Sequence, residues 1–279
     1  MSKVNFMCIG APKSGTTWLY QILNQHPDIF IPKEKELHYF NALHPETYLP
    51  NQNFSKDIAW YHSFFKDSKS AMLTADFSTS YLADPDMAQK LFQYNPNLKI
   101  LIMLRNPVAR AWSHFSFLQS RGMLRSNNFF EESKRNQSIL NAGHYANRIE
   151  VLIQQFTASQ VKILFYEELN EPEKLIQSVI EFLQLPNFSP EGLHQKVNAT
   201  KLVKSTALHE IVTFIKHSLL GKVLNKLKMN NLLIYFYNLN AANQAKNEVP
   251  EEIEAYLRNY YKEDIKKLNT LLDKKIWNP

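Results

Sequence analysis

A short apolar segment followed by a turn between two glycines is the feature that most constrains the fold of this chain. Residues 4–9 are apolar enough for a buried strand, and Gly10 and Gly15 then enclose a loop of small and polar residues. A helical pattern over 16–25 begins directly after Gly15. A strand, a tight turn and a helix N-terminus bring backbone N–H groups and the positive end of the helix dipole together. The sequence therefore predicts an anion-binding loop at the end of its first strand.

This loop differs at one position from the P-loop that binds nucleoside triphosphates. The P-loop pattern has Lys and then Ser or Thr directly after its second glycine, whereas Thr16 and Thr17 follow Gly15 here. The lysine of this loop is Lys13, inside the turn. Because the lysine for a β/γ-phosphate pair is missing, the loop is predicted to bind one terminal anionic group beside a sugar rather than a triphosphate with magnesium.

A second candidate anion site follows the clearest buried-strand pattern, at residues 99–104. Arg105 comes directly after it, and ligands of open α/β sheets bind at the carboxyl ends of strands. A guanidinium in that place presents a fixed fork of donors to a phosphate. Ser113 follows two turns into the helix predicted over 107–119.

Together the two motifs resemble those of sulfotransferases, which use 3′-phosphoadenosine 5′-phosphosulfate (PAPS) as donor and release PAP. The residues similar to the family's 5′-phosphosulfate loop are Pro12, Lys13, Ser14, Gly15, Thr16, Thr17 and Trp18. The residues similar to its 3′-phosphate motif are Arg105, Asn106, Pro107, Arg110 and Ser113. The resemblance implies that Arg105 and Ser113 bind the 3′-phosphate of PAPS and that Lys13 reaches the bridging oxygen as PAP leaves. Arg110 either belongs to this phosphate motif in function or caps its helix or forms an ion pair on it.

The resemblance also reaches a basic loop further along the chain. Family members carry a loop here that closes over the nucleotide, and the residues in this position are Lys201 and Lys204. They are candidates for a second contact with the 3′-phosphate. A solvent-exposed basic loop without that role fits the same residues.

A candidate base for the acceptor's proton lies in the segment Glu36-Leu37-His38-Tyr39-Phe40. It resembles the segment that supplies a catalytic glutamate in the heparan-sulfate branch of the family. The resemblance implies that Glu36 is the base and that His38 orients the acceptor. Small-molecule sulfotransferases use a histidine base, so His38 is the alternative, and a solvated run of mixed charge is the other interpretation of Glu36. In an extended backbone the two side chains would share one face.

The chain departs from the heparan-sulfate branch at residues 76–81. That branch has a Glu-Lys pair there, and its lysine is a second catalytic cation, whereas this chain has Phe77. The departure weakens the expectation of a heparan-like acceptor. The acceptor is therefore expected to be a hydroxyl, or an amine, of a carbohydrate or a small metabolite.

Alternating strand and helix patterns predict an α/β fold, with a P-loop-like central parallel sheet, helices on both faces and a helical C-terminal region. The predicted strands are 4–9, 30–31, 71–75, 99–104 and 161–165. The predicted helices are 16–25, 58–65, 85–94 with Asp84 as N-cap, 107–119, 145–156, 172–183 and 251–272. Trp277 is expected to pack back on the body. No linker divides the chain, so 1–279 is predicted to be a single sulfotransferase domain.

The chain also reads as helical from Thr206, and 205–245 is expected to be an acceptor-side segment. Its lysines at 216, 222, 226 and 228 alternate with apolar residues. One interpretation is a basic helix face that meets an acceptor or a membrane surface. The other is a helix face exposed to solvent.

Composition restricts the partners. The 32 basic and 26 acidic residues give a formal charge of +6, which suits anionic ligands. No long run of like charge or nucleic-acid motif is visible, so no nucleic-acid partner is expected.

Cys8 is the only cysteine, which excludes an internal disulfide and leaves no cysteine-based metal site, and no metal is expected. The N-terminus is too polar for a signal peptide or membrane span, so a cytoplasmic protein without a transmembrane segment is expected. The sequence does not indicate an oligomeric state.

Two other functions remain open. An ATP- or GTP-dependent kinase or NTPase would need Lys at position 16 and an acidic strand end for magnesium, whereas the chain has Thr16 and ends its clearest strand in Leu104-Arg105. The other is a PAP-binding module that has lost its chemistry, and the presence of Lys13, Arg105 and Ser113 argues against it.

Overall fold

The structure is a computed structural model, and it describes residues 3–43, 50–68, 71–121, 123–195, 202–203, 241–242 and 248–279. Within these residues the central sheet has five parallel strands in the order β2-β3-β1-β4-β5. The strands are β1 (Phe6–Gly10), β2 (Ile29–Phe30), β3 (Leu73–Phe77), β4 (Lys99–Leu104) and β5 (Val161–Phe165). A separate antiparallel pair joins β6 (Leu202–Val203) to β7 (Ala241–Ala242).

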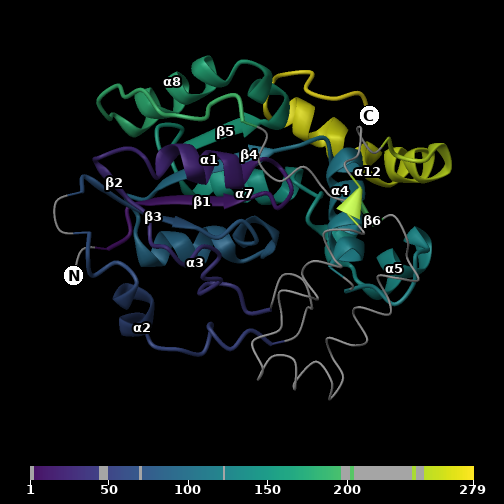
Figure 1. Ribbon diagram of the computed structural model, residues 1–279, viewed down its shortest axis with the longest axis horizontal. Coiled ribbons are helices and arrows are strands. Elements are labelled where there is room, and N and C mark those ends of the chain that lie inside the picture. The colour runs from purple at the N-terminus through teal and green to yellow at the C-terminus, as the bar shows by residue number, and fades with distance from the viewer. Residues whose placement is uncertain are drawn as a thin grey trace.

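Helices cover both faces of the sheet, as predicted (Figure 1). Successive side chains of β1 point to opposite faces, because a strand has a period of two: Phe6 and Cys8 belong to one core cluster, and Met7 and Ile9 to the other. The first cluster is covered by α1 (Thr16–Leu23) and α8 (Pro172–Leu183). The second is covered by α3 (Met87–Tyr94), α4 (Pro107–Ser120), α7 (Ala146–Gln155) and α12 (Glu251–Leu271). The other short helices among the described residues are α2 (Ile58–Ser63), η1 (Tyr81–Ala83), α5 (Phe129–Arg135), α6 (Ser138–Asn141) and η2 (Tyr166–Asn170).

Two predicted elements begin later than expected, and one helix was not predicted. The strand predicted at 71–75 is β3, two residues later, and all five of its residues are buried. The helix predicted at 85–94 begins at Met87, and Asp84 does not cap it, because its carboxylate instead accepts from the Asp86 N–H at 3.0 Å and from Lys90 Nζ at 2.8 Å. α5 was not predicted, although the Asn128 side chain caps it by accepting two backbone N–H groups.

The C-terminal residues close the second core. α12 packs on α4 and α7. The expected return of Trp277 is confirmed: its ring lies edge-on to Phe165, with 5.8 Å between ring centroids, and its indole N–H donates to Glu167 at 3.1 Å. The predicted acceptor-side segment 205–245 lies outside the described residues except for β7.

The parallel arrangement decides where the candidate residues meet. Because all strands of the central sheet run in one direction, their carboxyl ends share one edge. The segments that leave β1, β2, β3 and β4 at this edge carry, respectively, the anion loop (residues 10–17), Glu36 and His38, the 78–81 turn, and Arg105.

Candidate active site

The anion loop has the backbone that a cradle for one anionic group requires. Lys13 and Gly15 both have positive φ, 69° and 92°, which turns successive N–H groups to the inside of the loop. Gly15 is the N-cap of α1, so the N–H groups of its first turn have no acceptor within the helix. The Ala11 N–H donates to the Met103 carbonyl at 2.7 Å, which ties the loop to β4. The cradle is therefore fixed to the sheet.

The side chains of the anion loop take different directions. Ser14 is fully buried and Thr16 nearly so, whereas Thr17 is half-buried at the start of α1. The Trp18 ring is buried, and its indole N–H donates to the Leu193 carbonyl at 3.0 Å. The Trp18 side chain is thus bound to the segment that carries Leu193 and points away from an anion in the loop.

Lys13 reaches from the loop towards α4. Its ammonium nitrogen lies 4.0 Å from the centroid of the Phe117 ring, a cation–π contact. Ser113 precedes Phe117 by one helical turn, so the two residues share one face of α4. The fold thus brings the predicted leaving-group lysine to the helix that carries the predicted phosphate-binding serine.

Arg105 lies beside the same loop. Its Nη1 donates to the Lys13 carbonyl at 3.2 Å, and its guanidinium carbon lies 4.5 Å from the centroid of the Tyr166 ring. Burial lowers the pKa of Arg105. The Tyr145 hydroxyl donates to the Arg105 carbonyl at 3.0 Å and so supports its backbone. Arg105 is therefore a partly desolvated cation held in one orientation.

The other residues of the second motif are structural. Asn106 caps α4 by accepting from the Val108 N–H at 3.0 Å, and Pro107 opens the helix. Arg110 is fully buried and donates to the Ile139 carbonyl, so it lies in the core rather than in a surface ion pair. His114 lies next to it, and burial, with the charges of Arg110 and Lys13, lowers the pKa of His114 to about 3.

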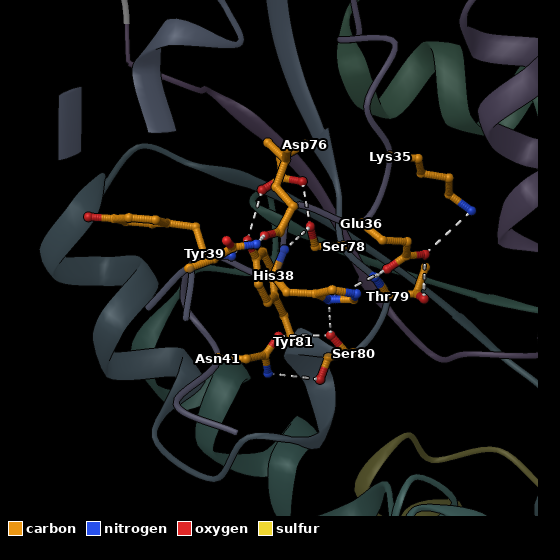
Figure 2. Close-up of polar contacts among 12 residues, drawn as sticks. Lys35, Glu36, His38, Tyr39, Asn41, Asp76, Ser78, Thr79, Ser80 and Tyr81 are labelled. Atoms are coloured by element: carbon orange, nitrogen blue, oxygen red, sulfur yellow. Dashed lines mark hydrogen bonds and ion pairs between the residues drawn. The ribbon is translucent and has the colours of Figure 1, made fainter. Parts of the chain in front are cut away.

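Glu36 is held by the turn that follows β3 (Figure 2). Its Oε2 accepts from the Thr79 N–H and its Oε1 from the Thr79 hydroxyl, both at 2.8 Å. Lys35 Nζ lies 3.5 Å from Oε1, and the Glu36 side chain is 29% exposed. Burial raises the pKa of Glu36, while Lys35 and Thr79 oppose the shift. A fixed, partly desolvated carboxylate with a raised pKa is suited to general-base work.

The segment that carries Glu36 and His38 is not extended. Glu36 has φ 63° and His38 has φ 51°, both in the left-handed region. The two side chains still meet, with His38 Nδ1 3.9 Å from Glu36 Oε2, because each is bound by the same turn. Glu36 is also not a freely solvated charge, because Thr79 binds both of its carboxylate oxygens.

The hydrogen bonds of His38 assign its tautomer. Its Nδ1 lies 2.7 Å from the Ser80 hydroxyl, which itself donates to Asn41 Oδ1 at 2.8 Å. Because that hydroxyl has one hydrogen and uses it on Asn41, it accepts from His38, and the neutral ring carries its proton on Nδ1. The basic atom of His38 is then Nε2.

Asp76 anchors this turn from within the core (Figure 2). Its carboxylate accepts from the hydroxyls of Tyr61 at 2.9 Å, Tyr81 at 3.0 Å and Ser78 at 2.7 Å. Burial raises the pKa of Asp76 to about 6. The Ser78 oxygen accepts in turn from the His38 N–H at 3.3 Å. This carboxylate at a strand end is therefore committed to the fold rather than to a magnesium ion.

Several residues that surround the site were not predicted. Thr79 and Ser80 orient Glu36 and His38, Tyr145 supports Arg105, and Lys35 lies against Glu36. The sequence signal for the first two was a run of hydroxyl residues at a strand end, 78–80. Lys201 and Lys204 lie outside the described residues.

The sequence model of the family described as "Sulfotransferase domain" matches residues 4–269. This chain belongs to the sulfotransferase family. The resemblance, the enzyme class and the α/β fold predicted from the two motifs are thereby confirmed, and a P-loop kinase or NTPase is not favoured.

Several relatives of known name are heparan sulfate sulfotransferases. The chain is 26% identical over 220 residues to the bifunctional heparan sulfate N-deacetylase/N-sulfotransferase 1 of Caenorhabditis briggsae, a match that covers 71% of this chain and 24% of that sulfotransferase. It is 24% identical over 190 residues to the heparan sulfate glucosamine 3-O-sulfotransferase 5 of Mus musculus, covering 64% of this chain and 52% of that one. The chain thus spans about a quarter to a half of the length of these relatives.

A solved structure has the same fold. The sulfotransferase from Alicyclobacillus acidocaldarius superimposes on 98% of this chain and 97% of its own, with a TM-score of 0.70 and 23% identity. In the described part of the present sulfotransferase, no helix is long and apolar enough to cross a membrane. Among the same residues, no three His, Cys, Asp or Glu side chains are grouped as a metal site would need.

Proposed function

We propose that this sulfotransferase moves a sulfuryl group from PAPS to a hydroxyl or amine of a carbohydrate acceptor and releases PAP. The observation that carries the proposal is the Glu36 carboxylate, held by Thr79 at the same sheet edge as the anion loop. The names of the heparan-sulfate relatives support a glycan acceptor. Phe77, where that branch has a lysine, keeps a small metabolite as the second candidate.

For the donor, we propose that the anion loop, Pro12 to Trp18, holds the 5′-phosphosulfate. Arg105 and Ser113 bind the 3′-phosphate, with Lys201 and Lys204 as a second contact. The fit rests on the buried cradle, on the first-turn N–H groups of α1, and on a guanidinium already oriented by Tyr166. PAPS, when bound, supplies an activated sulfuryl group and a phosphate leaving group.

In the transfer step, the acceptor oxygen forms a bond to sulfur as the bond between sulfur and the bridging oxygen breaks. The negative charge that develops on the leaving phosphate is stabilised by Lys13. The acceptor's proton goes to the Glu36 carboxylate, whose raised pKa makes it a stronger base than an ordinary glutamate. His38, with its Nδ1 fixed by Ser80, orients the acceptor or, as the alternative, takes its proton on Nε2.

Three further expectations stay predictions: a single domain over 1–279, an acceptor-side role for 205–245, and a cytoplasmic location. A PAP-binding module without activity is the alternative to the enzyme. It would require that Lys13 and the Glu36–Thr79 pair serve binding alone.

Ligand-dependent melting and a transfer assay test the proposal together. PAP should raise the melting temperature of the protein, whereas ATP with Mg²⁺ should not. Incubation with PAPS and a panel of desulfated heparin, small alcohols and amines should give a sulfate adduct by mass spectrometry, with the same yield in EDTA. Stabilisation by ATP–Mg²⁺ alone would favour an NTPase, and PAP binding without any adduct would favour the binding module.

A further inference from the structure

The site contains a cation, Lys35, close to position 77, where the heparan-sulfate branch has its second catalytic lysine. Phe77 replaces the second catalytic lysine of the heparan-sulfate branch, and it is 1% exposed. Its ring packs edge-on against Tyr20, with 5.6 Å between centroids, and against Phe6 at 5.9 Å. Position 77 thus lies beside Tyr20 but supplies no charge to the site.

Lys35 brings an ammonium group to the same Tyr20 ring. Its Nζ lies 5.8 Å from the centroid of that ring, on which Phe77 also packs. The backbone N–H of the following residue, Glu36, donates to the Phe77 carbonyl at 3.0 Å. The segment after β2 therefore runs along the end of β3 and delivers a lysine to the neighbourhood of position 77.

The contacts of Lys35 lie between the anion loop and the base. Nζ donates to the Thr17 hydroxyl, in the first turn of α1, at 3.2 Å, and lies 3.5 Å from Glu36 Oε1 (Figure 2 shows the second contact). The Lys35 side chain is 19% exposed. By contrast Lys33, in the same run of charges, is exposed. An ammonium has three donors, and these two partners leave one N–H for an oxygen of a third group.

We propose that Lys35 is a second catalytic cation of this enzyme, which contacts the sulfuryl group during transfer. The inference rests on the proposed function. Lys13 acts on the leaving side, where the bond to PAP breaks, and Lys35 acts beside Glu36, where the acceptor oxygen attacks and loses its proton. Negative charge on the transferring group then has a cation on each side.

Lys35 has a second, linked effect on the base. Its positive charge lowers the pKa of Glu36, against the burial that raises it. The other titratable groups that face Glu36 are His38 of the same segment, Asp76 of β3 and Cys8 of β1. Removal of the Lys35 charge should therefore shift the acidic limb of the rate profile to higher pH, which a loss of packing alone would not do.

The test compares Lys35→Met, which keeps the apolar stem against Tyr20, with the matched control Lys33→Met. The readouts are kcat for transfer from PAPS to desulfated heparin, PAP affinity by calorimetry, and the pH profile of kcat/KM. Lys35→Met should lower kcat by about 100-fold or more, change PAP affinity by less than about threefold, and shift the acidic limb upward. Lys33→Met should behave as wild type.

A relocation variant and a rescue experiment complete the test. Phe77→Lys added to Lys35→Met should recover part of the lost kcat. Because position 77 is buried and this double variant can fail to fold, ethylamine is also added to Lys35→Ala, where it should restore turnover in a dose-dependent way. Full kcat in Lys35→Met, or an unmoved pH profile with no amine rescue, would overturn the role of Lys35. No transfer by the wild-type enzyme would instead contradict the proposed function itself.

Discussion

Arg105 should recognise the 3′-phosphate of the donor, and this can be measured without knowledge of the acceptor. A hydrogen bond between a cation and a phosphate contributes about 1.5–3 kcal/mol, which corresponds to roughly 10–150-fold in affinity. The structure favours the upper half of that range. The guanidinium is already held by the Lys13 carbonyl at 3.2 Å and stacked 4.5 Å over Tyr166, so little side-chain entropy is lost on binding.

The assay is calorimetric titration of wild type and Arg105→Ala with PAP and with AMP, which lacks the 3′-phosphate. The variant should lose about 30–150-fold for PAP and less than about threefold for AMP. Arg105→Lys, which keeps the charge and loses the fork, should fall between. Arg258→Ala, on the exposed face of α12, controls for net charge. Equal losses for PAP and AMP would refute the assignment, because the side chain would then not distinguish the two ligands.

Two further predictions concern Lys13 and His114. Lys13→Ala should lower kcat with saturating PAPS by about two orders of magnitude or more, because it removes one preorganised charge at the leaving oxygen; an unchanged kcat would remove Lys13 from the mechanism. His114 has a pKa of about 3 in the fold, below its unfolded value, so its contribution is present above about pH 6.5 and is lost as the pH falls towards 3. In urea titrations, the free energy of unfolding of wild type should therefore fall by roughly 2–3 kcal/mol more than that of His114→Gln when the pH is lowered from 7 to 4.5. A difference between the two proteins that does not change with pH would contradict this.

Elements with an uninterrupted pattern could be predicted from the sequence. The bounds of β4 and α8 are those expected, since the first is a continuous apolar run and Pro172 opens the second. β3 was placed two residues early because Asp76 interrupts its apolar pattern. That carboxylate can be buried only because hydroxyls at positions 61, 78 and 81 donate to it. Such partners become visible only after the chain has folded.

The chemistry of the site could be predicted better than its conformation. Residue types and strand ends indicated Lys13, Glu36 and Arg105, and parallel topology explains why they share an edge. The left-handed backbone at Glu36 could not be predicted, because tertiary contacts with the turn after β3 select it. For the same reason the place of Lys35 beside Glu36 was not predicted.

The most direct test of the account is transfer by Glu36→Gln. Glutamine fits the pocket, because its oxygen can accept the Thr79 N–H while its NH₂ group donates to the Thr79 hydroxyl. It cannot take a proton at neutral pH, so turnover from PAPS to desulfated heparin should fall by about 10²–10⁴-fold. PAP affinity should stay at the wild-type value, and His38→Ala should be milder. Near-full turnover in Glu36→Gln together with an inactive His38→Ala would contradict the account and make His38 the base.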